Sequence, residues 1–379
     1  MIALAAALLL QAASERDVVV TAQPPAATER TLKECLARGC PPDEEIAAAL
    51  AHAENQFVAG DYAASTRTLQ RTIDRVRGSA GDYPVSVGDI LRAKGRIIEH
   101  LGFPEVAQGA QTGSLDALRQ GLGADDARVL VQRIEVADTL AKMGKFEVAE
   151  GIYNSVARQA RKTGRGALEG RALMRTAAMW TSLATSDPPL SEYALRRGRA
   201  RTALARIGRT TDPALAPFRE AAMLLAARLD GRPENAVLDR LVAGVRTPAS
   251  ATPTLISAPP YVTGGLGGRA VAAAKVGAVG FDGQWIDIGF RIKPDGFVDQ
   301  VELLRASPGA QRFWIELTLR QTRGRRYAPL DLPADAPGRF QVERVTMTSD
   351  YIPARKRSGS PIPIRSGTPR FVTTDLSTG

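Results

Sequence analysis

The C-terminal part of the chain is dominated by residues 285–304, WIDIGFRIKPDGFVDQVELL, which predict a β-hairpin. Apolar residues alternate with polar or small ones along the first half, and this period of two indicates a strand with one buried face. A Pro-Asp-Gly turn follows, in which Pro294 presets one backbone dihedral and Gly296 frees another. A second strand is expected from Phe297 to Leu304. The alternating apolar positions of the first strand are Ile286, Ile288, Phe290 and Ile292.

The residues after the hairpin predict a helix and one further long strand. Phe313, Trp314 and Leu317 are spaced so that one face of a helix can cover the sheet. A basic elbow, Arg-Tyr-Ala-Pro at 326–329, leaves the helix, and residues 339–349 are expected to form the last strand. Residues 281–352 are therefore predicted to be a small α+β domain with the order strand, strand, helix, strand.

This domain resembles the C-terminal domain of the TonB energy-transducer family. The run Gly-Phe-Val-Asp-Gln-Val at 296–301 is similar to that family's hairpin, and the elbow at 326–329 is similar to the one that follows its helix. The family's membrane anchor and long proline-rich spacer have no counterpart in this sequence. The resemblance therefore implies the fold and recognition by strand pairing, and it does not imply transmission of the proton motive force.

The resemblance also implies where a partner would bind. Family members bind extended peptides by adding a strand to the edge of their sheet, a mode in which backbone hydrogen bonds supply most of the affinity. The last strand is then the candidate docking edge, and a closed packing domain with no ligand is the alternative. The residues expected along this edge are Phe340, Val342, Arg344, Thr346 and Thr348.

A second short match lies near the N-terminus, at residues 17–22. It resembles the TonB box, the segment by which outer-membrane receptors are held by the same domain. Three successive β-branched residues pair readily with a sheet edge, so we expect this segment to dock on the C-terminal sheet of its own or a neighbouring chain. The residues are Asp17, Val18, Val19, Val20, Thr21 and Ala22.

Residues 1–14 begin with an apolar run and end in Ala12, Ala13 and Ser14, a pattern typical of a short secretory signal peptide. A disordered or helical N-terminus is the alternative. The run is too short to span a bilayer, which takes ~20 residues, and no other segment of the sequence qualifies. We therefore expect an exported, soluble protein in the periplasm of a Gram-negative cell.

Residues 15–42 are predicted to be an extended N-terminal segment, because they include the proline pairs Pro24-Pro25 and Pro41-Pro42. The chain has two cysteines, Cys35 and Cys40, and both lie in this segment. An oxidising compartment would let them close a small disulfide loop before the first helix, and two free structural thiols are the alternative.

The spacing of apolar residues predicts an α-helical array over 43–246. Two segments, 53–69 and 137–153, share a pattern in which a helix ends in Gly, and the next begins with an aromatic residue and Ala. This resembles tetratricopeptide repeats of ~34 residues, although the interval between the two copies is not a whole number of such units. Divergent repeats or irregular helical pairs explain the pattern as well as a regular array does. Stacked helical pairs leave a concave face that can hold a peptide.

Composition changes on either side of the C-terminal domain. Residues 247–280 are rich in Pro and Gly and are predicted to be a linker, which includes an extended segment packed against the next domain. Residues 353–379 are rich in Pro, Ser, Thr and Arg and are predicted to be a disordered basic tail.

The sequence contains no recognisable motif for catalysis, for a cofactor or for a metal ion, so no residue is assigned to such a site. Its two histidines, His52 and His100, are expected on helix surfaces or groove walls. The net charge of +10 is compatible with binding to nucleic acid or anionic lipid, and equally with an Arg-rich composition that has no such partner. A helix bearing Arg196, Arg199 and Arg206 could present a basic stripe to a polyanion or to anionic lipid. Nucleic acid is not an expected partner of an exported protein.

The predicted function is a non-enzymatic periplasmic scaffold or adaptor with a link to TonB-dependent uptake. Its expected partners are other envelope proteins or extended peptides, bound by strand addition and in the helical groove. The alternative is a protein that binds polyanions, or touches an anionic membrane surface peripherally, through its Arg-rich helical faces. The sequence assigns no oligomeric state.

Overall fold

The computed structural model describes residues 24–185, 190–231, 247–248, 253, 255–259, 284–348, 351–352, 364–365 and 370–377. The predicted signal peptide at 1–14 and the TonB-box-like segment at 17–22 lie outside the described residues. The described chain is mostly α-helical and carries a small antiparallel sheet, as the sequence predicts. None of the described helices is both long and apolar enough to cross a membrane.

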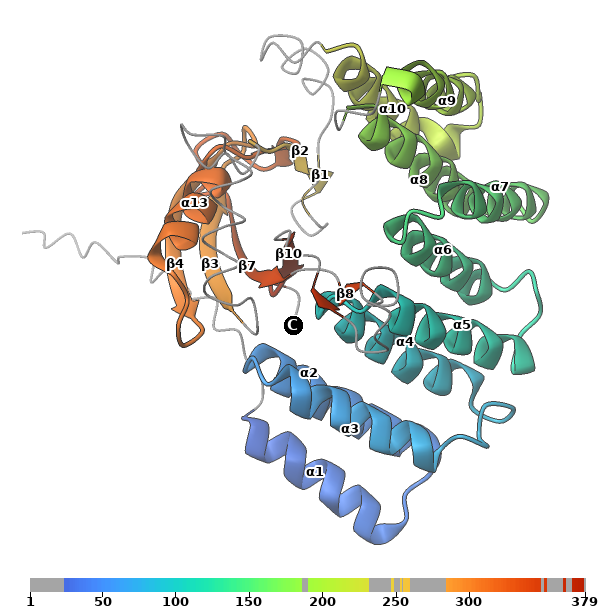
Figure 1. The fold of residues 1–379 in the computed structure, drawn as a ribbon, viewed down its shortest axis with the longest axis vertical. Coiled ribbons are helices and arrows are strands. Elements are labelled where there is room, and N and C mark those ends of the chain that lie inside the picture. Colours follow the sequence, from blue (N-terminus) through green and yellow to red (C-terminus); the bar gives the residue numbers. More distant parts are fainter. Residues whose placement is uncertain are drawn as a thin grey trace, which may run out of the picture.

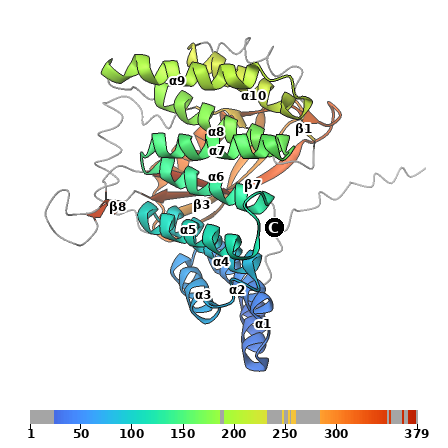
Figure 2. The same cartoon turned by 90° about the vertical axis from the view of Figure 1, so that its right-hand side faces the viewer.

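The helices form pairs that stack one on another from α1 to α10 (Figures 1 and 2). Several begin with a proline in their first turn, where its missing N–H costs no hydrogen bond. After α1, which is described below, the helices are α2 (Pro42–Val58), α3 (Tyr62–Arg75), α4 (Pro84–His100), α5 (Pro104–Gly121), α6 (Ala127–Lys142), α7 (Phe146–Lys162), α8 (Gly166–Thr185), α9 (Leu190–Gly208), the short 3₁₀ turn η1 (Pro213–Leu215) and α10 (Ala216–Leu229).

The helical pairs repeat with a period that is longer than the ~34 residues of a tetratricopeptide repeat. Gly60, Gly102 and Gly144 follow α2, α4 and α6 with φ values of 84°, 91° and 77°, and 42 residues separate each glycine from the next. The two copies recognised in the sequence are thus two units apart, with a third copy between them. The fifth residue after each glycine is small and fully buried, which lets adjacent helices approach closely: Ser65, Ala107 and Ala149.

The predicted extended segment at 15–42 is wrong over its described part, because α1 (Pro25–Arg38) is a helix. The Pro-Pro pair that suggested a loop places a proline in the first turn of α1, where it is compatible with a helix. Leu32 of α1 packs in the same buried cluster as Ile46 of α2. Cys35 and Cys40 form a disulfide, so the first of the two alternatives is confirmed, although the bridge closes the turn after α1.

The C-terminal domain is built on a four-stranded antiparallel sheet in the order β10-β7-β3-β4. The predicted hairpin is present, and Gly296 has a φ of 86° in its turn, where its N–H donates to the Lys293 carbonyl at 2.9 Å. The predicted order strand, strand, helix, strand is also present. The elements are β3 (Trp285–Ile292), β4 (Val298–Ala306), α13 (Arg312–Arg323), β7 (Arg339–Thr348) and β10 (Arg370–Asp375).

The strand β3 is buried on both faces, whereas the alternation in the sequence predicted one buried face. The predicted apolar positions of β3 pack in one cluster with Trp314 of α13, which is fully buried. The intervening residues Trp285 and Asp287 are only 9% and 1% exposed. They lie on the second face, where the helical array covers the sheet (Figure 1).

The segments flanking the domain also contribute strands. In the predicted linker, β1 (Thr247–Pro248) pairs with β6 (Leu330–Asp331) and β2 (Leu255–Ser257) pairs with β5 (Arg326–Tyr327), so the expected extended segment is present. The predicted disorder at 353–379 is wrong where the tail is described, because β10 joins the sheet. Two further strands, β8 (Tyr351–Ile352) and β9 (Ile364–Arg365), pair with each other. Aromatic and β-branched residues in β10 favour a strand despite the basic composition around it.

Candidate binding groove between the helical array and the sheet

A groove with a cavity volume of about 720 Å³ runs along the inner face of the helical array. One wall consists of side chains from α2, α4, α6 and α8, which are the first helices of successive pairs. The opposite wall includes Val372 and Thr374, which belong to β10 of the sheet. The groove is therefore formed jointly by the two halves of the described chain.

Charged side chains enter the groove at helical spacing, because residues three, four or seven positions apart lie on one face of a helix. The spacing would have marked these residues in the sequence, but the sequence analysis did not single them out. The charged residue on α2 is Glu54, those on α4 are Asp89, Arg92, Arg96 and Glu99, those on α6 are Glu135, Asp138 and Lys142, and the one on α8 is Arg175.

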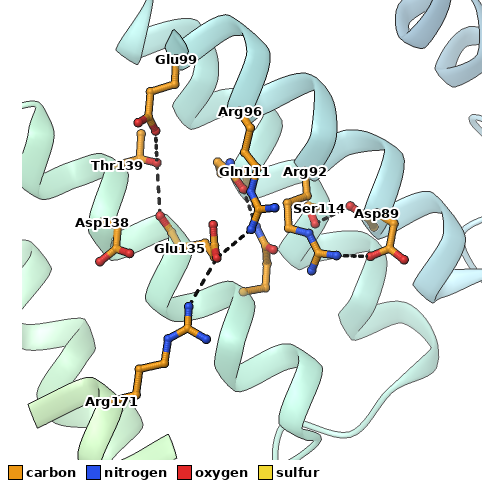
Figure 3. Close-up of polar contacts among 12 residues, drawn as sticks. Asp89, Arg92, Arg96, Glu99, Gln111, Ser114, Glu135, Asp138, Thr139 and Arg171 are labelled. Atoms are coloured by element: carbon orange, nitrogen blue, oxygen red, sulfur yellow. Dashed lines mark hydrogen bonds and ion pairs between the residues drawn. The ribbon is translucent and has the colours of Figure 1, made fainter. Parts of the chain in front are cut away.

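Ion pairs join neighbouring helices across the groove, as Figure 3 shows. Glu135 of α6 accepts contacts from Arg96 of α4 at 3.1 Å and from Arg171 of α8 at 3.6 Å. Glu99 of α4 pairs with Lys142 of α6. A network of this kind holds α4, α6 and α8, the first helices of three successive pairs, at a defined separation.

The carboxylates of this network are more buried than the cations. The side chains of Glu99 and Glu135 are each 17% exposed, whereas those of Arg96 and Lys142 are 60% and 52% exposed. Arg175 is 48% exposed beside Asp138, which is 19% exposed. Along α6, the charge that an incoming ligand meets first is therefore positive.

Asp138 is the most strongly perturbed acid in the groove. Burial raises the pKa of its carboxyl, an effect that Arg175 at 3.2 Å and a hydrogen bond from the Tyr153 hydroxyl at 2.6 Å only partly offset. Burial and the neighbouring Asp138 also raise the pKa of Tyr153, so this phenol remains protonated and donates. The pair fixes α6 against α7, and the arrangement is that of a structural contact.

The end of the groove nearest the sheet is apolar and aromatic. Phe57 and His100 line it, and their rings are 5.1 Å apart in an edge-on contact. His100 also lies 5.2 Å from the ring of Tyr62 and is 6% exposed, and it is part of the groove wall, which is one of the two places expected for it. His52 is buried too and hydrogen-bonds Thr28 at 3.1 Å, outside the groove.

The groove thus offers cations, amides, hydroxyls and an apolar end. Extended polypeptides present alternating main-chain donors and acceptors together with side chains, and such mixed surfaces suit them. Over the described ranges, no group of three or more His, Cys, Asp or Glu side chains is placed to hold a metal ion.

The predicted docking edge is not an edge in this structure. β7 lies inside the sheet, because β10 pairs with it from Arg370 opposite Thr348 to Asp375 opposite Glu343. The prediction of an open margin is therefore wrong for Arg344, Thr346 and Thr348, which lie in the part of β7 that pairs with β10. Val342 bonds Leu376 and Ser377 just beyond β10, and the pairing does not extend to Phe340. The tail that was expected to be disordered occupies this margin.

Three of those residues instead contact the helical array. Arg344 is fully buried and donates to the main-chain carbonyls of Phe57 and Val58, both at 2.7 Å. The Tyr62 hydroxyl lies 3.3 Å from Thr346 Oγ1, and Thr348 Oγ1 donates to the Leu101 carbonyl at 3.5 Å. These contacts meet the turn after α2, which the sequence analysis singled out as a repeat signature, and the end of α4.

The opposite margin of the four-stranded sheet is β4, which is irregular. Its pairing with β3 shifts twice, between Asp287 and Ile288 and between Gly289 and Arg291. Gln300, next to the second shift, has a φ of 50°. Bulges twist an edge strand and make it a poor template for another strand, so β4 is protected against edge pairing.

Most of the predicted basic stripe is neutralised by ion pairs. Arg196 pairs with Glu192, and Arg199 contacts Glu150 at 3.2 Å and stacks over the Trp180 ring at 4.5 Å. Arg206 differs, because the hydrogen bond from its guanidinium goes to the neutral Asn154 amide oxygen at 2.6 Å. A continuous basic stripe along α9 is therefore not present, and its positive charge is concentrated at one end.

No protein-family model matches the chain, and no curated protein matches it. Among solved structures, BtubC (BKLC) from P. vanneervenii is 16% identical and has a TM-score of 0.42, with 61% of this chain and 95% of that chain covered. RapI in its apo form is 11% identical and has a TM-score of 0.36, with 58% of this chain and 77% of that chain covered. Likeness at these TM-scores supports no inference about this chain.

Proposed function

We propose that this protein is a non-enzymatic scaffold of the Gram-negative periplasm that holds an extended, acidic polypeptide segment in the groove between its helices and its sheet. The observation that carries the proposal is the groove of about 720 Å³, in which Arg96, Lys142 and Arg175 are each more exposed than the carboxylates they pair with. An acidic segment would contact Arg96, Lys142 and Arg175 without disrupting the ion pairs beneath them.

The place of β10 supports an extended ligand. This strand is an extended segment, and two of its side chains already line the groove. A partner segment lying beside β10 would have main-chain groups on one side and charged helices on the other. Addition of a partner strand to β7 itself, as the TonB resemblance implies, would require β10 to leave.

The C-terminal domain supports a link to TonB-dependent uptake only through its likeness in sequence. We propose that the domain serves here as a fixed wall of the groove, because its second face is held against the helical array by Arg344. Export is supported by the apolar residues at 1–14 and by the Cys35–Cys40 disulfide, which needs an oxidising compartment to persist.

The test is selection from a library of displayed random peptides on the purified full-length protein, followed by fluorescence polarisation with the selected peptides. We expect enrichment of Asp and Glu, and affinities that fall with salt. In the double variant Arg96→Gln/Arg175→Gln, the affinity should fall about tenfold or more, which corresponds to about 1.4 kcal/mol. Both acids keep a partner in this variant, Glu135 through Arg171 and Asp138 through Tyr153.

The control variant Arg77→Gln/Arg312→Gln removes the same number of charges from side chains that are 80% and 92% exposed and lie outside the groove. It should bind the selected peptides as the wild type does. Equal losses in the two variants, or selection of peptides without acidic residues, would contradict the proposal. A fusion to a reporter that is active only after export tests the compartment separately.

A further inference from the structure

A second hollow lies between α7, α8 and α9, away from the groove described above. It consists of two cavities of about 480 Å³ and 850 Å³ that share the lining residues Thr202 and Arg206. Each lies within the range of about 300–1,000 Å³ usual for small-molecule sites. The two cavities differ in character, because one is mainly apolar and the other is basic.

The basic cavity gathers guanidinium groups with few acids to balance them. Arg161, Arg206 and Arg209 line it, together with the hydroxyl residues Thr202 and Thr210. Arg161 and Arg206 line the same cavity, and besides burial their mutual repulsion lowers the pKa of Arg206, an effect that Glu169 partly offsets. An anion between them would relieve this repulsion.

The acids at this end are already engaged. Glu169 is 4% exposed and bonds Arg161, whose Nε donates to it at 2.8 Å. Asp212 accepts from the main-chain N–H of Ala214 at 2.9 Å and so caps the start of η1. Arg206 and Arg209 have no acidic ion-pair partner among the residues that the structure describes.

The adjoining cavity has a mainly apolar surface, and Glu150, Asn154 and Arg199 also line it. Leu173 of α8 and Ala194, Leu195 and Ala203 of α9 form much of its surface. Leu195 is 59% exposed, which is unusual for a leucine on a helix that packs against two others. The apolar surface therefore starts at the basic end and continues along α9 toward solvent.

We propose that this hollow binds an amphipathic anion, with a phosphate head between Arg206, Arg161 and Arg209 and a single alkyl chain along Leu173, Ala194 and Leu195. Guanidinium groups and hydroxyls are the donors that phosphate oxygens prefer in proteins. The apolar cavity next to them removes the alkyl chain from water, which is favourable at about 0.8 kcal/mol per buried CH₂. A polyanion fits less well, because the other arginines of α9 are neutralised.

The test uses the full-length protein and calorimetric titration with monododecyl phosphate, inorganic phosphate and the neutral detergent dodecyl maltoside. We expect monododecyl phosphate, below its critical micelle concentration, to bind at least tenfold more tightly than either of the others. Arg206→Gln and Leu195→Asp should each weaken this binding about tenfold or more. Arg312→Gln, which changes an exposed side chain of α13, should leave it unchanged. Equal binding of the neutral detergent, or unchanged binding in Arg206→Gln, would overturn the proposal.

The phosphate could belong to a free amphiphile or to a membrane lipid, and vesicle sedimentation distinguishes the two. The head group would be assigned to a membrane lipid if the protein pellets with phosphatidylglycerol vesicles but not with phosphatidylcholine vesicles, and if Arg206→Gln abolishes this pelleting. Absence of pelleting together with binding of monododecyl phosphate would assign the site to a free ligand. Neither Arg206 nor Leu195 lines the peptide groove. Failure of the amphiphile proposal therefore leaves the proposed scaffold function intact, and failure of the scaffold function leaves the amphiphile proposal intact.

Discussion

Arg344 donates from its guanidinium to the main-chain carbonyl of Phe57 at 2.7 Å, across 287 residues of sequence. The same side chain forms two hydrogen bonds with Asp287, at 2.7 and 3.0 Å, and lies 3.8 Å from the centre of the Trp285 ring. Because the last carbonyls of a helix have no partners within it, Arg344 satisfies those at the end of α2 and complements the helix dipole. One buried cation therefore joins the sheet to the helical array.

Replacing Arg344 by Met should lower the free energy of unfolding by about 3 kcal/mol, because it breaks a buried ion pair and removes the guanidinium donor from the Phe57 and Val58 carbonyls. Urea unfolding followed by circular dichroism measures this loss. Arg305→Met is the matched control, since Arg305 also bonds Asp287 but is 51% exposed, and it should cost about 1 kcal/mol or less. Similar losses in both variants would contradict the role given to Arg344.

Gly60→Ala should cost more stability than Gly144→Ala. Both glycines end an inner helix at positive φ, so each substitution carries the same backbone cost of roughly 1–2 kcal/mol. A Cβ at Gly60 would also overlap the Trp285 indole, whereas one at Gly144 would meet nothing within 4 Å. The difference between the two variants in urea unfolding isolates the contact between sheet and array, and equal values would show that the contact is loose.

Phe371→Ala should loosen β10 from the sheet, because the Phe371 ring packs 6.3 Å from that of the buried Trp314. Hydrogen–deuterium exchange followed by mass spectrometry should show faster exchange over 342–348, the part of β7 that pairs with β10. Thr373→Ala, at an exposed position of β10, should leave the exchange rates unchanged. Unchanged exchange in Phe371→Ala would show that β10 is held by its backbone bonds alone.

Asp138→Asn should stabilise the protein increasingly as the pH rises above 3.8, the ordinary pKa of an aspartate. Burial raises the folded-state pKa of Asp138, so the folded state binds more protons than the unfolded state between the two pKa values. The stability contributed by this group is complete below 3.8 and is lost as the pH rises through the raised value. Thermal unfolding of both proteins from pH 3 to 7 measures the difference, and a constant difference would contradict the shift.

Reduction of the Cys35–Cys40 disulfide should lower stability by about 2 kcal/mol, as expected for a bridge that closes a very short loop. The loss should arise from weaker packing of α1 on α2, since Leu32 and Ile46 share one buried cluster there. Urea unfolding with and without dithiothreitol measures it. The Cys35→Ser/Cys40→Ser variant should match the reduced protein and should not respond to the reductant.

The local elements were predictable because their signals are short in sequence. The hairpin at 285–304 follows from alternation and a Pro-Asp-Gly turn, and the helix ends at Gly60 and Gly144 follow from the need for a left-handed residue. The 42-residue period was missed because the intervening copy at Gly102 has Pro104 where the other two copies have the aromatic residues Tyr62 and Phe146. The charged positions of the groove were present at helical spacing, yet nothing local shows which helix face turns inward.

The sequence by itself determined the helical array, the hairpin, the helix that covers one face of the sheet and the pair of cysteines able to form a bridge, because each depends on neighbours in the chain. Only the tertiary structure decided that β10 pairs with β7, that Arg344 reaches the end of α2, and that the groove has a wall from each half of the chain. Those contacts join residues that are not neighbours in the chain, from the strands β7 and β10 to Arg344 and the distant end of α2. They depend on which surfaces remain to be buried once the local elements have formed.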